Sequence, residues 1–433
     1  MRVPKLLRSL LALGRAVVII DWELVPETAQ TRADLVVWIR QKTRKRGRCG
    51  RCGARSPWFD QGGGRRSWRH VDVGYATCTL VALAPRVRCP AHGVTVAAVP
   101  WARHDSVFSR AFEDLVVYDA VASSKQRAAD RHSVSWRAVN NACVRVAEEA
   151  LSRVDLLDGL SAVAIDEVKY KKGQRYLTVV CNHATGKVVW AAKGRSKDTV
   201  AAFFDALGEQ RSAALQFVTA DGADWIHDVV ALRAENAIVC LDTFHVVGWA
   251  TKAVDDVRRE EWNALRRSGT ADAAKGVKGL RWLLLRNWEN LSRSQRSEIR
   301  ALEAANRRIH RAWRLKEELR DIFTKGLIAA RRALDRWLAY ASRSRLEAFV
   351  KLARTIRAFR EKIESTIKYG FTNGVAESNN ASIGRLRANA RGFHDPDSFI
   401  VMIMLDRAGI APQLPWNQAS RPTTRSVVPR IGP

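Results

Sequence analysis

The stretch from residue 160 to 245 limits the possible folds most strongly, because its apolar runs switch between the two-residue repeat of strands and the longer repeat of helices. Short turns at Lys172-Gly173 and Thr185-Gly186 separate the first three runs. The predicted elements are strands at 162–168, 176–181 and 188–192, a helix at 198–207, a strand at 215–219, a helix at 225–233 and a strand at 237–241. This order is typical of an RNase H-like α/β fold, although many α/β domains look similar.

Two acidic residues stand at corresponding ends of these predicted strands. Asp166 ends the first strand, and Asp221 follows the fourth, directly before Gly222. In an RNase H-like sheet these two strands are neighbours, so the carboxylates would lie within reach of shared metal ions. A single acid in such a place is more often a helix cap or a loop residue. The pair together favours a metal site.

A third carboxylate is expected from Glu377, on the first turn of a helix that begins after Gly374. Alone, it would be interpreted as a solvated carboxylate stabilised by the helix dipole. Phosphodiester hydrolysis needs an activated water and a stabilised leaving oxygen, and two divalent ions about 3.5–4 Å apart supply both. Carboxylate oxygens are the ligands that Mg²⁺ prefers. We therefore expect Asp166, Asp221 and Glu377 to hold two Mg²⁺ or Mn²⁺ ions per active site.

A second metal site is predicted near the N-terminus by two closely spaced pairs, Cys49 with Cys52 and Cys89 with His92. Thiolates and imidazole suit one tetrahedral, structural Zn²⁺. A redox-active Cys-x-x-Cys is the alternative, but the second pair argues against it. The long gap predicts a β-ribbon at 68–81, with Cys78 buried in it rather than acting as a fifth ligand. The chain has 7 cysteines, an odd number that fits a reducing cytosol better than a disulfide framework.

Residues 107–150 read as three short helices, at 107–121, 124–130 and 135–150, capped by Ser124 and Ser133. Three short helices are common, but beside a basic zinc module they indicate a helix-turn-helix. Its last helix would enter the major groove of DNA. The residues predicted to contact DNA from this helix are Ser135, Arg137, Asn140, Asn141 and Arg145.

The charge points to nucleic acid as well. Lys plus Arg number 73 against 44 for Asp plus Glu, a formal net charge of +29. Neutralising phosphates releases counterions, so such a protein binds DNA with strong salt dependence. A merely solvated or RNA-associated basic protein is the alternative. No apolar run has the length of a membrane span, and we expect a cytoplasmic protein associated with a bacterial nucleoid. Further candidates for DNA contact are Arg44, Lys45, Arg46, Lys171 and Lys172.

Between Asp221 and Glu377 the chain is much longer than a minimal RNase H-like fold requires. The segment 251–368 is strongly helical, with basic residues on one face and tryptophans among the apolar residues of the other. One interpretation is a helical insertion that embraces DNA and stacks an aromatic side chain on it. The alternative, which we favour for any single tryptophan, is a core residue beside a solvated basic face.

Taken together, these motifs resemble the ISL3 family of bacterial insertion-sequence transposases. The resemblance covers nearly the whole chain and rests on Ala164-Ile165-Asp166-Glu167, Ala220-Asp221-Gly222-Ala223, Asp242-Thr243-Phe244-His245, Asn373-Gly374-Val375-Ala376-Glu377 and Ala390-Arg391-Gly392-Phe393-His394. It implies a DDE triad of Asp166, Asp221 and Glu377 in an RNase H-like core. It also implies a supporting role for Asp242 and His245, although a helix cap and a packed histidine are equally good interpretations of those two.

One position departs from the family pattern. Many relatives carry Lys or Arg after the isoleucine of the glutamate helix, where this chain has Gly384. Arg385, Arg387 and Arg391 are the candidates to supply the missing phosphate contacts.

The expected architecture is therefore a split RNase H-like catalytic core with a large all-helical insertion, preceded by a zinc module and a helix-turn-helix. The expected segments are 1–40 (N-terminal), 41–104 (zinc module), 105–155 (helix-turn-helix), 156–250 (core), 251–368 (insertion), 369–410 (core with the glutamate helix) and 411–433 (flexible tail). The expected function is to bind transposon ends and target DNA, self-associate as a dimer or larger assembly, and catalyse strand cleavage and transfer. A domesticated DNA-binding regulator and a structure-specific nuclease are the alternatives.

Overall fold

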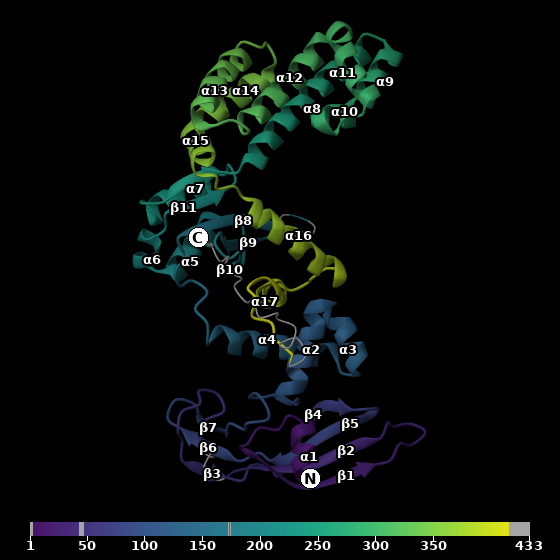
Figure 1. Cartoon of the computed structure of the whole chain (residues 1–433), viewed down its shortest axis with the longest axis vertical. Coiled ribbons are helices and arrows are strands. Elements are labelled where there is room, and N and C mark those ends of the chain that lie inside the picture. The colour runs from purple at the N-terminus through teal and green to yellow at the C-terminus, as the bar shows by residue number, and fades with distance from the viewer. Residues whose placement is uncertain (1–2, 43–46, 172, 174, 415–433) are drawn as a thin grey trace, which may run out of the picture. The chain divides into compact units, whose positions relative to one another are not determined.

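The computed structural model of the chain describes residues 3–42, 47–171, 173 and 175–414 (Figure 1). Contacts divide the chain into two compact units: Met1–Asp155 with Arg385–Pro433, and Leu156–Gly384. No helix in the described part of the chain is long and apolar enough to cross a membrane.

The first unit begins with a short helix, α1 (Val3–Leu10), and a four-stranded sheet. Its strands β1 (Val17–Val25), β2 (Asp34–Gln41), β5 (Ala76–Leu83) and β4 (Arg65–Val73) lie in the order β1-β2-β5-β4. The hairpin of β4 and β5 is the ribbon predicted at 68–81, and Cys78 is buried in it. Because β2 pairs with β5, the boundary expected at residue 40 divides a single sheet. The sequence could not predict this pairing, which joins strands far apart in the chain.

A three-stranded sheet of β3 (Trp58–Asp60), β6 (Arg86–Cys89) and β7 (Gly93–Val96) follows. Three helices come next: α2 (Arg110–Ala122), α3 (Lys125–His132) and α4 (Trp136–Leu151). Ser109, Ser124 and Ser135 accept hydrogen bonds at their N-termini. The predicted cap Ser124 is therefore confirmed. Ser133 instead ends α3 in the left-handed conformation, at φ 53°.

The last helix, α17 (Pro396–Arg407), belongs to this unit. Met402 and Leu405 are buried in one apolar cluster with Phe112 of α2 and Val139 of α4. Residues 369–410 were expected to complete the catalytic core. Within that segment, the apolar face of α17 packs on the three-helix domain.

The second unit contains a five-stranded sheet in the order β10-β9-β8-β11-β12. Its strands are β8 (Ala162–Lys171), β9 (Arg175–Asn182), β10 (Val188–Lys193), β11 (Phe217–Ala220) and β12 (Ile238–Leu241). β8, β9 and β10 are antiparallel, whereas β8, β11 and β12 run parallel. The intervening helices are α5 (Lys197–Leu207), α6 (Glu209–Ala213) and α7 (Asp224–Arg233). Except for the short α6, every element was predicted.

The two faces of this sheet are covered differently. Val163 and Ile165 of β8 share a buried cluster with Phe203 of α5 and Ile226 of α7. Helix α16 (Gly374–Asn389), which carries Glu377, begins beside the same sheet (Figure 1). Residues of β8 alternate between the faces, so Asp166 points away from the cluster that contains Ile165.

The helices after β12 have their own core, and α8 leads from the sheet into them (Figure 1). They are α8 (Thr243–Arg267), α9 (Ala271–Gly279), α10 (Arg281–Leu285), the 3₁₀ helix η2 (Trp288–Asn290), α11 (Arg293–Ala305), α12 (Arg307–Ile322), α13 (Leu327–Ser342), α14 (Glu347–Ala358) and α15 (Arg360–Tyr369). Because α8 is continuous, the helical part begins at residue 243 and not at 251. Trp313 and Trp337 are core residues as expected, but Trp282 is exposed.

Candidate functional site

Strand register sets Asp166, Asp221 and Asp242 side by side. In the parallel ladders, Thr219 of β11 pairs with Ala164 of β8, and Ala220 pairs with Leu241 of β12. Continued by one or two residues, these registers put Asp221 level with both Asp166 and Asp242. Neighbouring strands lie about 4.7–4.9 Å apart. Three acidic residues therefore form a row across three adjacent strands.

Asp166 is buried, with 8% of its surface exposed. Its Oδ1 accepts a hydrogen bond from the Glu167 amide, and its Oδ2 accepts one from Asn380 Nδ2, both at 2.7 Å. Burial, with smaller contributions from the charges of Asp221 and Asp242, raises the pKa of Asp166 to about 6, while the hydrogen bond from the Glu167 amide and the charge of His245 lower it. The site thus gathers negative charge that a cation would stabilise.

Asp242 and His245 form a pair at the start of α8. Asp242 is buried, and its carboxylate accepts hydrogen bonds from the amides of Phe244 and His245, so it is the N-cap. His245 Nδ1 lies 2.5 Å from Asp242 Oδ2. This hydrogen bond raises the pKa of His245, and the charges of Asp221 and Asp166 add to the effect. Asp242 is therefore both a cap and a partner of a histidine that faces the acids.

Helix α16 is anchored to the sheet by three asparagines. Asn373 accepts a hydrogen bond from Thr219 Oγ1 at 3.0 Å, Asn379 donates to the Gly186 carbonyl at 2.9 Å, and Asn380 donates to Asp166. Glu377 lies on the first turn, as expected, and three residues before Asn380 on the same side of the helix. Burial raises the pKa of Glu377, and the negative charge of Asp242 makes a smaller contribution in the same direction. Glu377 therefore faces the same cluster.

The acids are set more widely than the ligands of a single ion. Among the described residues, one group of three or more Cys, His, Asp or Glu has all its ligand atoms within 4.8 Å, and it consists of Cys49, Cys52, Cys89 and His92. Asp166, Asp221 and Glu377 do not reach that spacing, although Asp166 interacts electrostatically with Asp221, and Glu377 with Asp242 and His245.

Several residues that support this region were missed in the sequence. Glu167, next to Asp166, forms a 3.2 Å ion pair with Arg195, and burial followed by the charge of Asp221 raises the pKa of Glu167 to about 7. Asn380 was also missed, although its spacing from Glu377 on a predicted helix is a usable signal. Gly222 is required because an added Cβ would lie 2.2 Å from the ring of Trp249.

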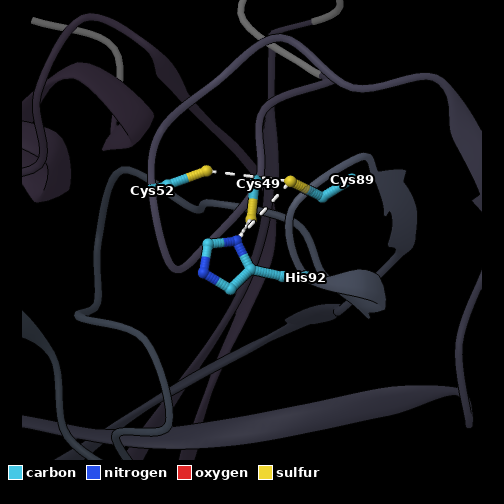
Figure 2. Close-up of side chains that lie close together, drawn as sticks. All are labelled: Cys49, Cys52, Cys89 and His92. Atoms are coloured by element: carbon cyan, nitrogen blue, oxygen red, sulfur yellow. Dashed lines mark hydrogen bonds between the residues drawn. The ribbon is translucent and has the colours of Figure 1, made fainter.

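The Cys and His residues of the first unit do form a compact set (Figure 2). Cys52 Sγ and Cys89 Sγ are 3.7 Å apart, and His92 Nδ1 lies 3.6 Å from Cys89 Sγ and 3.8 Å from Cys49 Sγ. Ligands about 2.3 Å from a tetrahedral ion are separated by about 3.8 Å. The distances between these four ligand atoms therefore match those of a tetrahedral zinc site.

The local structure favours metal binding by these ligands. A hydrogen bond with His92 lowers the pKa of Cys89 to about 6, with help from the backbone amides of Ala91 and His92. The thiolate is the form that binds metal. Gly53 and Gly93 adopt positive φ angles of 71° and 64° beside the two ligand pairs, which lets the chain turn sharply there.

The predicted DNA-contact residues of α4 fall into two groups. Arg137 and Asn141 are exposed one turn apart. Asn140 instead accepts a hydrogen bond from the buried Lys125 at 2.6 Å. Arg145 forms a 2.6 Å ion pair with Glu113, which is fully buried. Since burying the Glu113 charge requires a partner, Arg145 has a structural role that the sequence did not indicate.

The remaining basic candidates are distributed over both units. Arg44, Lys45, Arg46 and Lys172 lie outside the described residues. Lys171 is partly exposed at the end of β8. Arg385 is exposed and Arg387 partly exposed on α16, and Arg391 is exposed just after it.

Three protein-family models match successive parts of the chain. Residues 163–403 match a family described as "Transposase", with the name DDE_Tnp_ISL3. Residues 97–147 match the "Helix-turn-helix domain of transposase family ISL3". Residues 45–92 match the "zinc-finger of transposase IS204/IS1001/IS1096/IS1165" and include all four zinc-site residues. The chain is thus similar to this family in each of its modules.

Individual relatives agree. The chain is 41% identical over 434 residues to the "Transposase for insertion sequence element IS1557" of Mycobacterium tuberculosis, in strains H37Rv and CDC 1551, covering 96% of this chain and 98% of the relative. It is 29% identical over 243 residues to the "Transposase for insertion sequence element IS1001" of Bordetella parapertussis, covering 56% of this chain and 59% of that protein.

Proposed function

Because the chain belongs to the ISL3 family of transposases, we propose that it is an insertion-sequence transposase that cuts and joins DNA at an RNase H-like site. In this proposal the catalytic acids are Asp166, Asp221 and Glu377, and they bind two Mg²⁺ or Mn²⁺ ions. The strand order β10-β9-β8-β11-β12, with three antiparallel and two further parallel strands, supports the RNase H-like assignment.

The observation that carries the proposal is the placement of α16 against the row of acids. Asn380 donates to Asp166 across 214 residues of sequence, and Glu377 lies one turn earlier on the same helix. The donor set consists of hard carboxylate oxygens, which suit Mg²⁺.

The residues of the site have separable roles in this proposal. Bound ions would lower the pKa of an attacking water or 3′-hydroxyl and stabilise the leaving oxygen. Asn380 orients the Asp166 carboxylate, and Asp242 orients the His245 ring through Nδ1. His245 Nε2 makes no hydrogen bond within the described chain, so it can donate to a phosphate oxygen. The raised pKa of His245 favours the protonated ring that such a contact needs.

Recognition of DNA is assigned to the first unit. Arg137 and Asn141 of α4 are placed to reach base edges, because both are exposed on the last helix of the three. One structural Zn²⁺ would stabilise the zinc module, which precedes the three helices, and would be held by Cys49, Cys52, Cys89 and His92. Arg385, Arg387 and Arg391 would contact phosphates, and so would Lys171 of the second unit. Because two transposon ends must be processed together, we expect the protein to act as a dimer or larger assembly on the bacterial nucleoid.

Labelled duplexes that carry the element's ends test this function. With Mg²⁺ or Mn²⁺ the wild type should cut at the ends and transfer the freed 3′ strand to target DNA. Asp166→Asn, Asp221→Asn and Glu377→Gln should each abolish cutting and keep end binding. Binding without cutting by the wild type would instead indicate a DNA-binding regulator, and cutting without end recognition a structure-specific nuclease.

A further inference from the structure

An aromatic side chain stands exposed at the edge of the acid cluster. Phe244 is the second residue of α8, between the N-cap Asp242 and His245, and 67% of its surface is exposed. Its ring lies 6.3 Å from that of His245, edge to face. His245 in turn is hydrogen-bonded to Asp242 and interacts electrostatically with Asp166 and Asp221. Phe244 therefore borders the region where DNA would be cut.

The fold does not use this ring. Helix α8 is capped through the backbone amide of residue 244, which any side chain at that position would leave in place. The core of the helical part takes Val246, Ala250 and Val254 from α8, whereas Phe244 belongs to none of the apolar clusters of the described chain. A single exposed apolar residue is ordinary. Its place beside the acids is what calls for a ligand.

Two other strongly exposed residues of this unit, Trp282 and Leu232, differ from Phe244. Trp282 is 68% exposed, but the guanidinium of Arg281 lies 5.0 Å from the centre of its ring and covers a face. Leu232 is 80% exposed, but it is aliphatic and lies near the end of α7. Phe244 combines an open aromatic face with a position next to the acids.

We propose that the ring of Phe244 stacks on the base next to the scissile phosphate, after that base has left the duplex at the transposon end. The proposal rests on the proposed function, which supplies DNA as the substrate. Every base has a face on which an aromatic ring can stack, whatever its sequence. Inside a duplex both faces are already stacked, so the base must turn out to meet the ring. Phe244 is therefore a positioning residue, which holds the strand while the acids and their ions act.

The test compares cleavage rates of element-end duplexes by the wild type, Phe244→Ala, Phe244→Trp and the exposed control Leu232→Ala. Loss of one stacked base corresponds to about a 5- to 150-fold slower rate. We expect that loss for Phe244→Ala, near-normal rates for Phe244→Trp and Leu232→Ala, and equal unfolding midpoints for all four proteins. The measurements are repeated with a series of duplexes, each of which carries one abasic site at a different nucleotide flanking the cut.

An abasic site at the stacked position should remove the difference between wild type and Phe244→Ala, while abasic sites elsewhere should leave it. Equal rates for wild type and Phe244→Ala on intact duplex would overturn the proposal. So would a Phe244→Ala defect that persists at every abasic position. Asp166→Asn is measured alongside as the inactive reference. If the wild type cuts no faster than Asp166→Asn, both the proposed function and the Phe244 proposal are overturned. If the wild type cuts faster but Phe244→Ala equals it, only the Phe244 proposal is overturned.

Discussion

The side-chain amide of Asn380 donates a 2.7 Å hydrogen bond to the Asp166 carboxylate, 214 residues earlier in the chain. This contact ties the helix that carries Glu377 to the strand that carries the first acid. It leaves the Oδ1 atom of Asn380 buried without a hydrogen-bond partner among the described residues. An amide held in that way fixes the orientation of Asp166 and the position of α16 together.

Replacing Asn380 by alanine should therefore slow DNA cleavage more than it weakens DNA binding. A hydrogen bond to a charged group contributes about 1.5–3 kcal/mol, which corresponds to about a 10- to 150-fold effect. Single-turnover cleavage at several Mg²⁺ concentrations measures the rate and the metal requirement, and both should worsen. Asn389→Ala, on the exposed end of the same helix, is the control. An unchanged rate and metal requirement in Asn380→Ala would remove Asn380 from the site.

Replacing Asp166 by asparagine should stabilise the protein at neutral pH. Burial raises the pKa of Asp166 from 3.8 in the unfolded chain to about 6 in the folded protein. Between pH 3.8 and about pH 6, Asp166 is therefore deprotonated in the unfolded chain but still protonated in the folded protein. The free energy of unfolding of the wild type therefore falls as pH rises through that window, and Asp166→Asn avoids the loss. The gain is about 3 kcal/mol at pH 7 and should vanish near pH 4.

Denaturant unfolding at pH 4 and pH 7, in buffer without divalent salt, measures this difference, with the exposed Asp198→Asn as control. Added Mg²⁺ should narrow the gap at pH 7, because only the wild type keeps its full ligand set. A variant less stable than the wild type at pH 7 would contradict the electrostatic account of the site.

The purified protein should contain one equivalent of zinc, and Cys52→Ser or His92→Ala should lose it. Metal binding and folding are coupled in such modules, so loss of zinc should also abolish binding to element ends. Metal analysis and a binding assay provide the two measurements. Cys78→Ala is the matched control, since Cys78 is buried in the same unit but lies outside the ligand set. Full zinc content in the ligand variants would show that other residues bind the ion.

Replacing the two arginines of α4 should affect different properties, DNA binding for Arg137 and stability for Arg145. Arg137 is exposed, so Arg137→Ala should weaken end binding by about 1–3 kcal/mol without changing the unfolding midpoint. Arg145 pairs with the fully buried Glu113, so Arg145→Ala should lower stability by about 1–3 kcal/mol. Binding titrations and thermal unfolding separate the two effects. The opposite pattern would mean that α4 presents another face to DNA.

The order of elements in the second unit could be predicted because its apolar repeats and turns are local. The same is true of the zinc ligands, whose spacing carries the chemistry, and of Glu377, whose helix begins at Gly374. What local patterns could not give were pairings between distant segments. Examples are β2 with β5, α17 with the three-helix domain, and Asn380 with Asp166. Arg145 was assigned to DNA because the buried partner Glu113 has no signature in the sequence.

The most direct test of the account is a crystal structure of the chain bound to element-end DNA in Mn²⁺, with the ions located by anomalous scattering. The account predicts two Mn²⁺ ions about 3.5–4 Å apart, held by Asp166, Asp221 and Glu377 together. Ions held without one of these three side chains, or an acid cluster that binds none while DNA is in place, would contradict it.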